Sequence, residues 1–317
     1  MHWFQLLDEK VYPILAKRRR AGDRAVKVAV LDTGINLTHE RIQSHLDRHG
    51  SKIINCQDWT ASQHGTDDRI GHGTAVCDVL LRTAKVHLYV GKVSDEAAFD
   101  KNVPARVAQV TPDGWNVDII VLSLGFESED KGIRDAICDA SNKNVVILAA
   151  ASNSGSIDST KRVSFPARIH GRVIAVRSAT GFGRRADSSP GRSDGDDNFA
   201  ILGEGIEAAW PQHLNDGRPT RFVSGTSYAT PLAAGVAALI MEFSIQKDKR
   251  GPNLKKEALD VLMSYRGVRK MFEFMSATQD NSVNVDCRMI SPWRLFDPEM
   301  AYEGLAHVIE HQLKNAS

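Results

Sequence analysis

Short apolar runs alternate along this chain with segments whose apolar residues recur every three or four positions. The runs have the length of buried strands, whereas the segments between them have the period of helices that cover a sheet. Strands that are apolar on both faces and alternate with helices are typical of a parallel sheet. We therefore expect an α/β fold, a three-layer α/β/α sandwich with a mostly parallel central sheet. The expected strands are 26–31, 53–54, 86–93, 117–125, 145–151, 173–176 and 199–202.

The same periodicity predicts the helices and a division of the chain into two parts. From about residue 246 the composition becomes more charged and helical, without a recognisable motif. We expect one α/β domain over 1–245, which includes an N-terminal helix, and a helical extension over 246–317. The expected helices are 5–19, 75–81, a stretch through 107–108, 129–142, the segment after Ser227, 253–264, 266–276 and 298–313.

Composition and charge exclude several classes of partner. The 42% of hydrophobic residues suffice for a buried core, and 40 Lys and Arg against 39 Asp and Glu give no bias toward nucleic acid or anionic membranes. The four cysteines are widely spaced and form no C-x-x-C pair, which favours reduced thiols. Asp8 and Glu9 interrupt the place of an export signal, and no apolar run approaches a membrane span. We expect a soluble, cytoplasmic protein.

Polar residues follow or begin several of the expected elements. Asp32 ends a buried strand, where the ligand crevice of an open α/β sheet lies, although a turn-forming Asp before Gly34 is an alternative. Two His-Gly-Thr tripeptides begin at His64 and His72. We choose His72, because the buried helix that follows it would fix the imidazole, whereas His64 is followed by a loop composition.

A small, Gly-containing turn at 223–231 leads directly into an apolar helical segment. Ser227 lies at the start of this helix, where free N–H groups and the helix dipole favour a developing negative charge. This placement is typical of a nucleophile at a helix start. Taken alone, this stretch is better explained by an ordinary Ser- or Thr-capped helix.

Six motifs in a fixed order resemble those of the subtilisin-like serine proteases, the subtilase family, between residues 25 and 245. One motif alone is weakly specific, whereas six in the family's order are very specific. They are Val30-Leu31-Asp32-Thr33-Gly34-Ile35, Gly71-His72-Gly73-Thr74, Leu122-Ser123-Leu124-Gly125, Ala149-Ala150-Ala151-Ser152-Asn153, Phe165-Pro166-Ala167-Arg168 and Gly225-Thr226-Ser227-Tyr228-Ala229-Thr230-Pro231.

The resemblance implies a subtilisin-like fold and a serine endopeptidase. Ser227 would be the nucleophile, His72 its general base and later acid, and Asp32 the group that holds the tautomer of His72. The side-chain amide of Asn153 and the backbone N–H of Ser227 would form the oxyanion hole.

The resemblance also implies how substrate binds. Leu122, Ser123, Leu124 and Gly125 would pair with an extended protein or peptide substrate. By the same matching, Ser152, Ser154 and Ser164 lie near the primary specificity pocket, and none of them is acidic. The acidic residues that follow the pairing segment favour basic residues further upstream in a substrate, or simply form a solvated loop. These residues are Glu127, Glu129 and Asp130.

The sequence departs from the family pattern without losing a catalytic group. Where the family usually has His after His-Gly-Thr, this chain has Ala75, and where the family then has a pair of small residues, it has Cys77 and Asp78. Ser152 replaces the Gly that usually precedes the oxyanion Asn, and Tyr228 follows the nucleophile.

We expect no metal and no cofactor. Residues 81–86 lack the inserted loop that carries the strong calcium site of secreted members, so calcium has no recognisable loop here. Asp194, Asp196 and Asp197 resemble part of a hard-cation loop, but Phe199 stands where such a loop needs Gly. There is no room before Asp32 for an inhibitory prodomain, so we expect a regulatory partner or a neighbouring domain to restrain activity.

Other functions remain open at this stage. Asp32-Thr33-Gly34 matches the aspartic-protease tripeptide, but no second copy occurs, and His307-x-x-Glu310-His311 matches a zinc-protease pattern without room for a third ligand. A binding or regulatory module on the same fold, or the effector domain of a larger intracellular sensor, is the serious alternative. The intact Asp32, His72, Asn153 and Ser227 favour an enzyme.

Overall fold

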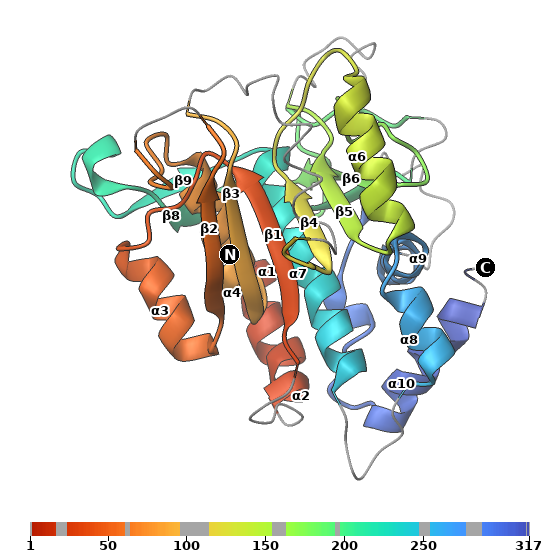
Figure 1. Ribbon diagram of the computed structural model, residues 1–317. Helices are drawn as coiled ribbons and strands as arrows, with labels where there is room; N and C mark the ends of the chain where they lie inside the picture. Colours follow the sequence, from red (N-terminus) through yellow and green to blue (C-terminus); the bar gives the residue numbers. More distant parts are fainter. Residues whose placement is uncertain are drawn as a thin grey trace.

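A computed structural model of the protein describes residues 2–16, 24–60, 64–95, 114–153, 163–193, 197–246, 254–276, 287–314 and 316 (Figure 1). It contains a sheet of eight strands in the order β10-β7-β6-β5-β4-β1-β3-β2, in which every neighbouring pair is parallel. The strands are β1 (Val26–Asp32), β2 (Lys52–Asp58), β3 (Val86–Lys92), β4 (Ile119–Leu122), β5 (Val146–Ala150), β6 (Val173–Ala179), β7 (Phe199–Leu202) and β10 (Arg288–Met289).

Side chains of the sheet enter two hydrophobic layers, one on each face. In β1, Val28 and Val30 belong to one core cluster and Ala29 and Leu31 to the other, as expected for a strand buried on both faces. Helix α6 packs on the Leu31 face, while α4 and α7 pack on the Val30 face (Figure 1). The three-layer α/β/α architecture is therefore confirmed. These helices are α4 (His72–Thr83), α6 (Lys131–Asn142) and α7 (Thr226–Ile245).

Helix α3 (Glu40–His49), the antiparallel pair β8 (Ile206–Ala209) and β9 (Thr220–Val223), and the short edge strand β10 have no counterpart among the expected helices and strands. The inward side of α3 is partly polar, because Arg41 and His45 both bond to the buried Asp78 of α4. A helix that buries polar groups lacks the apolar period on which the sequence analysis relied. The expected helical stretch through 107–108 lies outside the described residues.

Other elements differ from expectation in their bounds. The strand expected over 117–125 is only β4, Ile119–Leu122, because pairing with β5 ends at Leu122 and Ala149. The strand expected at 53–54 is the longer edge strand β2.

The two ends of the chain pack together on the α7 side of the sheet (Figure 1). The indole rings of Trp3 and Trp293 lie 5.9 Å apart, and the Tyr302 hydroxyl donates to the Ile14 carbonyl at 3.2 Å. Residues from both terminal segments share one core cluster with α7. The terminal elements are α1 (His2–Leu6), the π-helical turn η1 (Leu7–Val11), α2 (Tyr12–Ala16), α8 (Lys256–Leu262), α9 (Tyr265–Ser276), the 3₁₀ turn η4 (Pro292–Arg294) and α10 (Tyr302–Lys314).

Helix α7 corrects the expectation that no apolar segment approaches the length of a membrane span. Its 20 residues are long and apolar enough by length and composition alone. Within the protein, however, 94% of the most apolar window is buried, as in the core helix of an α/β fold. The apolar composition of α7 is therefore explained by its burial against the sheet and the neighbouring helices.

Candidate active site

Two of the expected site residues are in direct contact. Asp32 ends β1 between two neighbouring strands and is fully buried, and His72 is the first residue of α4. His72 Nδ1 lies 2.7 Å from Asp32 Oδ1, and the Thr33 N–H donates to the same oxygen at 2.8 Å. An ionised carboxylate only accepts, so the proton of a neutral His72 lies on Nδ1, and Nε2 is left as an acceptor. His64 lies on an exposed loop instead.

The contact depends on two backbones that touch. A Cβ added to Gly73 would lie 2.3 Å from the carbonyl oxygen of Gly34. Only glycine therefore lets the start of α4 approach the turn after β1 so closely. This explains the Gly after His72, whereas the Gly after Thr33 is required by its φ of 106° and by the Thr66 carbonyl oxygen, which would lie 2.4 Å from an added Cβ.

Asp68 is a residue of this site that the sequence analysis missed. Its buried carboxylate accepts five hydrogen bonds: from the hydroxyl groups of Thr33 and Thr74 and from the backbone N–H groups of Ile70, Gly71 and Thr74. The Thr33 hydroxyl in turn accepts the Gly73 N–H at 2.9 Å. Asp68 thus ties the start of α4 to the end of β1. A carboxylate just before a helix start was the available signal, because such groups cap free N–H groups.

The environment of His72 raises its pKa above the ordinary value. Burial disfavours the imidazolium and so lowers the pKa of His72. The charge and hydrogen bond of Asp32 and the charge of Asp68 stabilise the imidazolium and raise that pKa. The carboxylates outweigh burial. The imidazole is therefore a stronger base than a free histidine.

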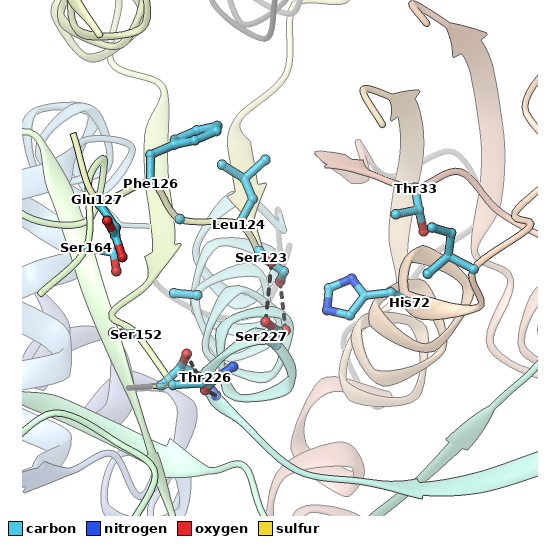
Figure 2. Close-up of a pocket in the computed structure, with 14 residues that line it drawn as sticks. Thr33, His72, Ser123, Leu124, Phe126, Glu127, Ser152, Ser164, Thr226 and Ser227 are labelled. Carbon is cyan, nitrogen blue, oxygen red and sulfur yellow. Dashed lines mark hydrogen bonds between the residues drawn. The ribbon is translucent and has the colours of Figure 1, made fainter. Parts of the chain in front are cut away.

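Ser227 lies in the first turn of α7, across the pocket from His72 (Figure 2). Its hydroxyl donates to the Ser123 carbonyl at 3.3 Å, and the Ser123 hydroxyl donates to the Ser227 carbonyl at 2.7 Å. In the described part of the chain no hydrogen bond joins Ser227 to His72. The 3.3 Å bond is long and weak, so a rotation about χ1 frees the hydroxyl at little cost. Such loose geometry is common in sites without substrate.

Asn153 has its amide orientation fixed by Thr226. The Thr226 N–H lies 2.8 Å from Asn153 Oδ1, and the Thr226 hydroxyl lies 2.9 Å from it. Because a backbone N–H can only donate, the atom facing it is the amide oxygen, and the Nδ2 donors are directed elsewhere. Gly225 permits this approach: its φ is 138°, and an added Cβ would lie 3.0 Å from Asn153 Oδ1.

His72, Asn153 and Ser227 line one pocket of about 380 Å³. Of the expected substrate-binding residues, Ser123, Leu124, Ser152 and Ser164 line it (Figure 2), and so does Gly125. The remaining lining residues are Thr33, Ile70, His72, Phe126, Glu127, Ala150, Asn153, Thr226 and Ser227.

Two expected substrate-binding residues are not among the described residues that line this pocket. The side chain of Leu122 is buried in the core between β4 and α6 and is only 1% exposed, which leaves its backbone alone for the expected pairing with substrate. Side chains alternate along a strand, so the residue before Ser123 points into the sheet's covered face. Ser154 lies outside the described residues.

Tyr228, one of the departures from the family pattern, packs against the candidate base. Its ring centroid lies 5.4 Å from that of His72, and the side chain is 8% exposed. The ring thus limits the positions that the imidazole can adopt.

The described residues show no cluster of three or more His, Cys, Asp or Glu side chains that could hold a metal ion. Asp194 and Asp196 lie outside the described residues, and Asp197 forms a two-pronged ion pair with Arg269 at 2.5 and 2.7 Å. Glu310 of the zinc-like pattern accepts the backbone N–H of Lys255 at the start of α8.

A model of the subtilase family matches residues 23–259, a range that contains Asp32, His72, Asn153 and Ser227. The chain belongs to the subtilase family. The family resemblance expected from the six motifs is confirmed.

Among curated subtilase relatives, the subtilisin-like protease het-Q2 of Podospora anserina is 31% identical over 198 residues, covering 58% of this chain and 52% of that protein. Subtilisin DY of Bacillus licheniformis is 28% identical over 232 residues, covering 68% of this chain and 76% of that protein. The thermostable alkaline protease of Halalkalibacterium halodurans is 32% identical over 244 residues, covering 71% of this chain and 59% of that protein. The chain therefore spans about half the length of the first of these relatives.

Two solved structures have the same fold as this subtilase chain. The prenylagaramide maturation protease PagA has a TM-score of 0.65 at 20% identity, with 90% of this chain and 97% of that chain covered. A lanthipeptide protease has a TM-score of 0.67 at 19% identity, with 85% of this chain and 86% of that chain covered.

Proposed function

We propose that this chain is a serine endopeptidase in which Ser227 is the nucleophile, His72 the general base and acid, and Asp32 the group that orients His72. The observation that carries the proposal is the 2.7 Å contact between His72 Nδ1 and Asp32 Oδ1. It leaves Nε2 as the free basic nitrogen of a ring that faces Ser227 in the pocket (Figure 2). Membership of the subtilase family supports the same assignment.

The reaction begins with attack of the Ser227 hydroxyl on the scissile carbonyl carbon, while its proton passes to His72 Nε2. The C–N bond of the tetrahedral intermediate then breaks, and His72 returns the proton to the leaving amine. Water attacks the acyl-enzyme in the same way, giving its proton to His72 and then releasing the acid from Ser227. Asp32 stays ionised throughout and stabilises the imidazolium.

The negative oxygen of each tetrahedral intermediate requires donors that are already in place. Asn153 supplies Nδ2, because Thr226 occupies its Oδ1. The second donor is the Ser227 N–H in the first turn of α7, where a helix has no internal acceptor. Fixed donors of this kind stabilise the transition state without reorganisation.

Substrate binds as an extended strand beside the segment that leaves β4. Ser123, Leu124 and Gly125 follow the last paired residue of β4 and line the pocket. Their backbone is therefore the natural partner for a peptide backbone, which would make binding largely independent of sequence outside the side-chain pockets.

The proposed reaction uses no cofactor. The connection between α4 and β3 is Ala84-Lys85, only two residues, which leaves no room there for an ion-binding loop. Activity that survives treatment with EDTA agrees with this proposal, and activity that is lost with EDTA and restored by calcium contradicts it.

Steady-state hydrolysis of a denatured protein substrate by the full chain tests the proposal. Ser227→Ala and His72→Ala should each lower kcat by about a million-fold, the loss found in subtilisin, a member of this family. His64→Ala is the matched control and should retain the wild-type rate. Hydrolysis that survives Ser227→Ala contradicts the proposal.

A further inference from the structure

Three acidic residues follow the pocket-lining segment that leaves β4, and the structure gives them different roles. Asp130 caps α6, accepting the Ile133 N–H at 2.9 Å. Glu129 forms a two-pronged ion pair with Arg134. Both carboxylates are thus used by local structure, and neither lines the pocket.

Glu127 is the third acidic residue and differs from both. Its side chain lines the pocket beside Ser164, on the wall opposite His72 (Figure 2). Among the described residues its carboxylate has neither a hydrogen bond nor an ion pair. Arg168 lies nearby, but its guanidinium donates to the Glu127 backbone carbonyl, at 3.0 Å.

The backbone at Glu127 is held firmly enough to place the side chain. Phe126 and Phe165 exchange two backbone hydrogen bonds, of 2.7 and 3.0 Å, immediately before Glu127. The Arg168 contact fixes the carbonyl of Glu127 itself. The residue is therefore anchored at the rim of the pocket, although its side chain is exposed to solvent.

The charge of the pocket is unbalanced at this rim. Apart from His72, Glu127 is the one titratable side chain among the described residues that line the pocket, and no Lys or Arg is among them. The other lining groups on that wall, Gly125, Ser152 and Ser164, are small and neutral. A cationic side chain entering from Ser227 would therefore meet uncharged walls and then a carboxylate without a partner.

We propose that Glu127 makes the enzyme select peptides with Arg or Lys immediately before the scissile bond. This inference rests on the proposed function, because the scissile carbonyl must lie between Ser227 and Asn153. The side chain of the residue that carries this carbonyl then occupies the part of the pocket that ends at Ser152, Ser164 and Glu127. Arg or Lys places its positive charge at that end and stacks its aliphatic stem along the pocket.

The test uses fluorogenic peptides that differ only in the residue before the scissile bond: arginine, its neutral isostere citrulline, and phenylalanine. With the wild-type full chain, kcat/KM for the arginine peptide should exceed that for the citrulline peptide by roughly 5- to 20-fold, because an exposed carboxylate becomes partly desolvated by the bound substrate. Glu127→Gln should lower this ratio to about one, since it removes the charge alone.

Glu129→Gln is the matched control, because Glu129 lies two positions further along the chain, does not line the pocket and already pairs with Arg134. It should leave the arginine-to-citrulline ratio unchanged. A ratio near one in the wild type, or a ratio that Glu127→Gln does not change, overturns the inference while the proposed function stands. Absence of cleavage of all three peptides, together with absence of labelling by a fluorophosphonate, overturns the proposed function and this inference with it.

Discussion

The carboxylate of Asp68 and the start of α4 are joined through Thr74: the Thr74 N–H and the Thr74 hydroxyl both donate to Asp68 Oδ2 at 2.7 Å. Because Thr74 lies two residues after His72, this bond fixes the first turn of the helix that carries the proposed base. Asp68 itself is too deeply buried to contact substrate. We therefore assign it a positioning role.

Replacing Asp68 with Asn should weaken this arrangement. An amide cannot accept all five hydrogen bonds, and donors left unpaired in the interior cost about 1–3 kcal/mol of stability. We expect kcat to fall while KM changes little, because the peptide does not touch this residue. The acid limb of the pH profile should also move to lower pH, because the charge of Asp68 helps to raise the pKa of His72.

The pH shift separates positioning from a purely structural role. Asp67→Asn is the matched control, since its side chain is exposed one position away. A fall in kcat without movement of the acid limb would mean that Asp68 acts only on folding.

The wild-type pH profile follows from the direction of the His72 shift. His72 accepts a proton only as the neutral imidazole, so kcat/KM rises as the pH passes upward through its pKa. Asp32 and Asp68 hold that pKa above the ordinary value despite burial, so the midpoint should lie above about pH 6.5. A midpoint clearly below the ordinary histidine value, measured at constant ionic strength, would contradict this account.

Tyr228 should matter through its ring and not through its hydroxyl. Tyr228→Ala removes a buried aromatic ring beside His72 and should lower stability by about 3–5 kcal/mol. It should also lower kcat, because the imidazole gains positions that do not face Ser227. Tyr228→Phe keeps the ring contact and should retain nearly the wild-type rate. Thermal denaturation and kcat of the two variants check this, and equal losses in both would contradict it.

Asp78 is the buried centre of a polar cluster on α4. It bonds His45 at 2.7 Å and Arg41 at 2.9 Å, and it accepts the Ala209 N–H of β8 at 2.9 Å. Asp78→Ala removes the buried carboxylate that His45, Arg41 and the Ala209 N–H share, and it should cost about 3–5 kcal/mol. Asp47 is an exposed acid on α3, the helix that carries Arg41 and His45, and Asp47→Ala should change stability little.

The stability difference between wild type and Asp78→Ala should depend on pH in a defined direction. Burial alone would raise the pKa of Asp78, but the His45 hydrogen bond, the charges of Arg41 and His45 and the Ala209 N–H lower it. The stabilisation is therefore present above the unfolded value of about 3.9 and is lost as the pH falls through the lower folded pKa. Urea denaturation at pH 7 and pH 3 measures this. A difference that grows toward acid pH would contradict the assignment.

Much of the fold was predictable because the sheet is parallel and covered on both faces. Buried strands such as β1 have no solvent face, so their apolar runs mark them even without knowledge of the partners. Helix α3 escaped for the opposite reason: its inward side chains include Arg41 and His45, whose partner Asp78 lies more than thirty residues away. Hydrogen-bonded polar groups in a core leave no apolar period.

The sequence predicted those residues of the site that a short local motif identifies. His72 and Ser227 each begin a buried helix, which the local sequence shows. The contacts that arrange them are not local: Thr226 bonds Asn153 across 73 positions, and Thr33 bonds Asp68 across 35. The sequence also could not show which of Glu127, Glu129 and Asp130 faces the pocket, because side chains only one or two positions apart along the chain can point in different directions.

The central claim is that Ser227 is a nucleophile activated by His72 and Asp32. The most direct measurement is incubation of the full chain with a fluorophosphonate, followed by mass-spectrometric mapping of the adduct, for the wild type and the His72→Ala and His64→Ala variants. The account predicts a single adduct on Ser227 in the wild type and in His64→Ala, and none in His72→Ala. An adduct on another residue, or Ser227 labelling that persists without His72, would contradict it.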